Sequence, residues 1–94
     1  MIDPNKMCDI SRKVLSAYTK IPLKEGAPFY MRLEFHYWDL PSIELWVFPE
    51  GSVEKVHSYR INFWKKEQEV EEETNELLKA LEDIKNTITK YTEV

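Results

Sequence analysis

Between residues 29 and 64 the sequence alternates apolar and polar side chains over three successive runs, and this period of two constrains the fold more than any other feature. Successive side chains of a β-strand point to opposite faces of the sheet, so each run is typical of a strand with one apolar face. Turn-forming residues separate the runs at Asp39-Leu40-Pro41 and at residues 49–52, Pro-Glu-Gly-Ser. The pattern therefore predicts a three-stranded antiparallel meander.

A helix is predicted on each side of the meander. Asp3 provides an N-cap and Pro4 fits the first helical turn, after which apolar residues recur at helical spacing to about Lys20. From about residue 65 to 92 they recur at steps of three and four, which predicts a long helix. Helix, three strands and long helix make an α+β fold (αβββα) in one domain, 1–94, with the N-terminal helix at 1–20, the meander at 29–64 and the C-terminal helix at 65–92.

The long helix carries one continuous apolar stripe, which we call the seam. It consists of Val70, Leu77, Leu81, Ile84, Ile88 and Tyr91. The helix would span ~42 Å, whereas a compact chain of this length is about 32 Å across, so the turns from Ile84 to Tyr91 should overhang the sheet. We therefore expect a homo-oligomer joined through the seam, since heptad spacing is typical of helix pairs. The alternative is that the seam packs on the sheet of its own chain.

Cysteine usage and hydropathy indicate a cellular location. Cys8 is the only cysteine, which excludes an internal disulfide and a cysteine-based zinc site, and this usage is typical of a reducing cytosol. No signal-peptide core and no apolar run of membrane-spanning length is present. We expect a cytoplasmic protein with no membrane association.

The acidic residues are concentrated in the last helix. Residues 67–94 hold nine Asp and Glu against three Lys, whereas residues 1–66 hold ten Lys and Arg against eight Asp and Glu. A candidate acidic face comprises Glu69, Glu72, Glu73 and Glu76. Such a row repels polynucleotides and could instead occupy a basic groove of a protein target, as a nucleic-acid mimic does. The alternative is an ordinary charged outer face, whose first-turn carboxylates interact favourably with the helix dipole.

The outward face of the meander is the second candidate surface, because it combines aromatic and charged side chains. Its predicted members are Tyr30, Arg32, His36, Glu44, Trp46, Phe48, Arg60 and Trp64. Trp, Tyr and Arg dominate binding energy in protein interfaces, and aromatic residues interleaved with arginine could also stack on a nucleotide-like ligand. The alternative is that a helix of this chain or the sheet of a second subunit covers this face.

No catalytic motif is present. If the hairpins close tightly, His36 lies in a cross-strand row with Glu44 and Arg60, and a carboxylate beside the imidazole could support acid or base chemistry. The alternative is a polar row that stabilises the sheet. His36 and His57 have opposite parity and cannot jointly hold a metal in one chain. We expect a protein that is not an enzyme, with no catalytic residue, no metal and no cofactor.

The size, the element order and the acid-rich helix resemble the general build of small phage-encoded inhibitors of bacterial enzymes and defence systems, some of which imitate DNA. The resemblance lies in layout, with no shared motif. It favours a non-catalytic inhibitor or adaptor that binds a protein target. Two alternatives are an oligomer that binds a nucleotide-like small ligand on the sheet face, and a structural assembly protein that uses the seam.

Overall fold

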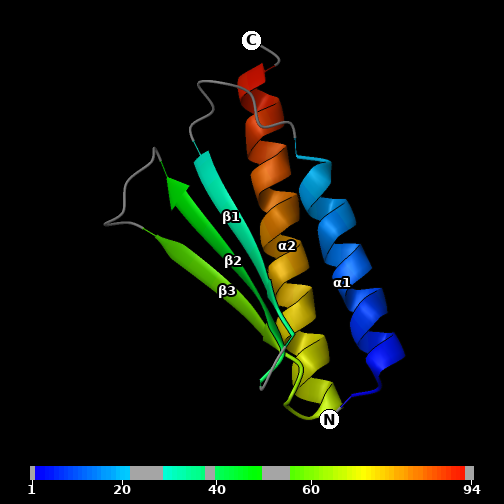
Figure 1. The fold of residues 1–94 in the computed structure, drawn as a ribbon. Coiled ribbons are helices and arrows are strands. Elements are labelled where there is room, and N and C mark those ends of the chain that lie inside the picture. Colours follow the sequence, from blue (N-terminus) through cyan, green and yellow to red (C-terminus); the bar gives the residue numbers. More distant parts are fainter. Residues whose placement is uncertain (1, 22–28, 38–39, 50–55, 93–94) are drawn as a thin grey trace.

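The computed structural model of the chain describes residues 2–21, 29–37, 40–49 and 56–92, with side chains of the last segment described as far as residue 87. The elements are α1 (Pro4–Thr19), β1 (Phe29–His36), β2 (Ser42–Pro49), β3 (His57–Asn62) and α2 (Glu67–Thr92). This order confirms the predicted αβββα arrangement (Figure 1). The long helix begins two residues later than predicted, and the third strand ends at Asn62, before the predicted boundary at residue 64.

The three strands form an antiparallel sheet in the order β1-β2-β3, and its two faces differ in character. One face is apolar, and both helices lie on that side of the sheet (Figure 1). The buried members of this face are Met31, Ile43, Leu45, Val47 and Ile61. The molecule therefore has two layers, a sheet and a pair of helices, with one hydrophobic core between them.

The seam of α2 belongs to this core. Val70, Leu77 and Leu81 are at most 1% exposed, and Ile84 is 9% exposed. These side chains belong to the core of the same chain, which is the alternative that the sequence left open, and homo-oligomerisation stays a prediction. The expected overhang at Ile84 is wrong because Ile84 is part of this core, while the side chains of Ile88 and Tyr91 lie outside the described residues.

α1 covers the remaining flank of α2. Asp3 caps it by accepting a hydrogen bond from the Asn5 backbone N–H at 2.8 Å, as the Asp-Pro sequence predicts. Ile10 and Val14 are buried in the common core. The hydroxyl of Tyr37, just beyond β1, donates to Ser11 Oγ at 3.0 Å and connects the sheet edge to α1. Among the described residues, neither helix has an apolar stretch that could span a bilayer.

The burial of the seam gives the first prediction. Leu77→Ala should lower the free energy of unfolding by about 2–5 kcal/mol, because it leaves a cavity in the core. Leu15→Ala is the matched control: Leu15 is 49% exposed on α1 and its truncation should change stability by no more than about 0.5 kcal/mol. Urea unfolding measures both. An equal effect of the two substitutions would contradict this placement of the seam.

Candidate binding surface on the open sheet face

The sheet face opposite the helices is open as far as the described residues show. Both helices lie on the other side, and no element within the described ranges covers it (Figure 1). Tyr30 is 60% exposed, and the side chains of Arg32 and Arg60 are 55% and 56% exposed. Trp46 and Phe48, on the central strand, are half-buried by their neighbours. The expected alternative that a helix of this chain covers the face therefore does not hold for the described residues.

The strand register changes the predicted polar row. Glu44 lies opposite Arg60, as expected, but its partner on β1 is Glu34, whereas His36 lies opposite Ser42. The first hairpin thus has a longer connection than a tight turn, which shifts the register by two residues and preserves the face of every side chain. The central row is Glu34, Glu44 and Arg60, and Glu34 is the member that sequence reasoning missed.

Ion pairs and hydrogen bonds link this row to its neighbours. Glu34 accepts from Arg32 at 2.7 Å through Oε1 and lies 3.3 Å from His36 Nε2 through Oε2. Glu44, whose side chain is only 12% exposed, pairs with Arg60 through Oε1, and its Oε2 accepts from Trp46 Nε1 at 3.0 Å. Each carboxylate therefore has one oxygen held by an arginine and the other directed to a ring nitrogen.

Aromatic rings extend the surface along the strands. The Arg32 guanidinium carbon lies 5.9 Å from the centroid of the Trp46 ring, and the rings of Tyr30 and Phe48 are 5.6 Å apart at 47°. Trp64 lies beyond the end of β3, so strand parity does not place it on this face. Its ring lies 5.7 Å from Lys65 Nζ and is separate from the Arg32–Trp46 contact.

The charge of this surface is balanced. Arg32 and Arg60 offset Glu34 and Glu44, and the two carboxylates occupy the centre while the arginines are more exposed. This distribution disfavours a phosphate group at the centre, because a phosphate there would face two carboxylates. Charged groups of both signs beside aromatic rings suit a protein interface better.

The acidic face of α2 divides into two parts. Glu69, Glu72 and Glu76 are exposed, and no ion pair involves them within the described residues. Glu73 differs, because its carboxylate accepts from the backbone N–H and side-chain amide of Asn62 and from Lys65 Nζ, at 3.2, 3.0 and 3.3 Å. It caps the end of β3 and joins α2 to the sheet, so its position in the acidic row does not make it available to a partner.

The role of Glu73 gives the second prediction. Glu73→Ala should lower the free energy of unfolding by about 1–3 kcal/mol, because the nearly buried Asn62 loses its acceptor. Glu72→Ala, one position earlier on the exposed side, should stay within about 0.5 kcal/mol of the wild type. Thermal and urea unfolding distinguish the two. Equal stability of both variants would show that the cap contributes nothing.

Two further features lie away from the open face. An open groove of ≈ 490 Å³ runs between α1 and α2, where Arg12, Lys13 and Lys20 border a floor of Ala17 and Leu81. Arg12, Lys13 and Lys20 attract anions in general, but all three are exposed surface side chains and indicate no specific anion site. His57 pairs with Val47 in register and so belongs to the helix-side face, opposite to His36, as the parity predicts.

No protein-family model, curated protein or solved structure matches this chain. Its function must therefore be argued from these surfaces alone.

Proposed function

We propose that the chain is a non-catalytic protein-binding domain, an inhibitor or adaptor that contacts its target through the open sheet face. The observation that carries the proposal is the contrast between the two faces of the sheet. One is covered by both helices, and the other holds Tyr30, Arg32, Trp46, Phe48 and Arg60 with nothing over them in the described residues. An aromatic surface of this kind is a common feature of interaction sites.

The contacts on this face favour a protein over a nucleotide-like ligand. Arg32 and Arg60 are already paired with carboxylates, and Arg32 lies against the Trp46 ring. A nucleotide would have to displace this pairing to gain both a stacking surface and a cation. A protein partner can instead leave the ion pairs in place and add contacts around them, since interfaces tolerate a polar network beside aromatic anchors.

The arrangement also indicates the chemistry of the partner. The two arginines flank the face with more than half of each side chain exposed, and the Tyr30 and Phe48 rings lie at one end. The complementary surface is a protein with carboxylates positioned for the arginines and an apolar patch for the two rings. The unpaired acidic row, Glu69, Glu72 and Glu76, supports a second candidate, in which α2 meets a basic surface. We place either interaction in the cytoplasm.

Self-association is constrained by the core. Because the seam as far as Ile84 is buried within one chain, a homo-oligomer would have to use other residues, and the open sheet face is one candidate. Pairing of two such faces would compete with the proposed protein partner.

Site-specific photo-crosslinking in cells tests the proposal as the third prediction. A crosslinking amino acid at Ser58, which is exposed on the open face opposite Trp46, should capture a discrete partner protein, whereas one at Asn75 on the outer side of α2 should not. Arg32→Ala should then weaken binding of the purified partner by about tenfold or more, as loss of an interface arginine does.

The controls separate the rival surfaces. The charge-neutral variant with Glu69, Glu72 and Glu76 changed to Gln should bind the partner as the wild type does. Capture from Asn75 with loss of binding in this variant would move the interface to α2. Capture of only a second copy from Ser58 would make the face a self-association surface and overturn the proposal, as would the absence of any crosslink.

A further inference from the structure

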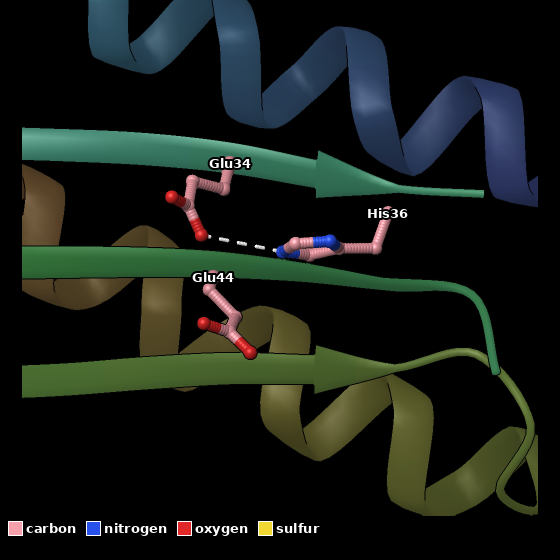
Figure 2. Close-up of side chains that lie close together, drawn as sticks. All are labelled: Glu34, His36 and Glu44. Atoms are coloured by element: carbon pink, nitrogen blue, oxygen red, sulfur yellow. Dashed lines mark hydrogen bonds and ion pairs between the residues drawn. The ribbon is translucent and has the colours of Figure 1, made fainter. Parts of the chain in front are cut away.

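We propose that Glu34, His36 and Glu44 form a binding site for a divalent transition-metal ion of the zinc class, a property beyond the proposed function and independent of it. The three side chains come from two adjacent strands, and Figure 2 shows Glu34 and His36 directed toward each other, with the Glu44 carboxylate beside them and turned toward β3. One potential ligand atom from each lies within 4.8 Å of the others. Three protein ligands beside open solvent are typical of zinc sites that keep a free coordination position.

The distances are close to those of a coordinated ion. His36 Nε2 and Glu34 Oε2 are 3.3 Å apart, and two ligands of a tetrahedral zinc ion with bonds of about 2.0–2.1 Å are separated by roughly the same distance. Glu44 is the third ligand and must approach the other two by a rotation of its side chain. Its backbone pairing with Glu34 places the two residues directly opposite each other on β1 and β2.

The opposed carboxylates of Glu34 and Glu44 favour the binding of a cation. Glu34 and Glu44 are directly opposite each other across β1 and β2, and like charges in such a cross-strand pair destabilise a sheet. Arg32 and Arg60 compensate from the flanks, but each holds only Oε1 of its carboxylate. The Oε2 atoms face ring nitrogens and not arginines, so a divalent ion could bind through them without displacing either arginine.

The neighbouring groups orient the ligands. Arg32 restricts the rotation of the Glu34 side chain, whereas Glu44 must exchange its contact with the Trp46 indole N–H for the ion. Outer contacts of this kind position the ligands of metal sites and raise affinity. The imidazole nitrogen selects zinc and related transition metals over calcium and magnesium, which prefer oxygen ligands in larger number.

Titration of the purified protein with Zn²⁺ and Co²⁺ tests the site as the fourth prediction. Because Cys8 is exposed and its thiol could bind metal, all proteins carry Cys8→Ser. Calorimetry should show one Zn²⁺ per chain, and Co²⁺ should give visible absorption bands of a low-symmetry site. His36→Ala and Glu44→Gln should each weaken binding by about 100-fold or more, since even outer contacts are worth 10–100-fold.

His57→Ala is the matched control, because His57 is on the opposite face, and it should leave affinity unchanged within about twofold. In the Cys8→Ser protein, which keeps both histidines, ¹⁵N spectra should show a zinc-dependent shift at His36 Nε2 and none at His57. Circular dichroism confirms that each variant is folded, and the 41% exposure of the His36 side chain makes its replacement tolerable. Absence of saturable binding up to roughly 1 mM Zn²⁺, or equal losses in the His36 and His57 variants, would overturn the site.

Discussion

The packing of α2 on the apolar face of the sheet is the interaction on which the rest of this structure depends. Leu77 and Leu81 are completely or almost completely excluded from solvent, and each is worth about 1.5–3 kcal/mol of hydrophobic free energy. In a chain of 94 residues, one such core is the main source of stability. Because α1 packs on the same side of the sheet as α2, no described residue outside the sheet covers the opposite face. The face that stabilises the fold is therefore opposite to the face that we propose for binding.

The sequence predicted the elements well because it specifies periodicity directly. Alternation over residues 29–64 and helical spacing elsewhere depend only on which side chains must avoid water, and all five elements lie within a few residues of their predicted positions. The same periodicity could not decide what the seam of α2 contacts. Steps of three and four residues suit a helix on its own sheet as well as a helix pair. The length estimate favoured the pair, whereas Leu77 and Leu81 are buried in the core of their own chain.

The register of the first hairpin could not be predicted, and the candidate metal site depends on it. A shift of two residues leaves every side chain on its face, so parity gives no signal when the assumed turn is too short. That shift moves the partner of Glu44 from His36 to Glu34 and creates a pair of opposed carboxylates. Glu73 shows a related limit. Its helical position suggested an exposed carboxylate, and only its hydrogen bonds to Asn62 at the end of β3 explain why it is partly buried.

The opposed carboxylates also restrict what the open face could bind under our proposal. A sheet surface with arginine and tryptophan alone would attract phosphates and nucleic acids broadly. Glu34 and Glu44 introduce two negative charges at its centre, and the arginines that neutralise them are thereby held at the flanks. Any partner must either avoid the centre or bring a positive charge to it. The two carboxylates therefore disfavour anionic ligands at the centre, and the geometry is compatible with both proposed occupants: a protein that contacts the flanks and a cation that binds between the carboxylates.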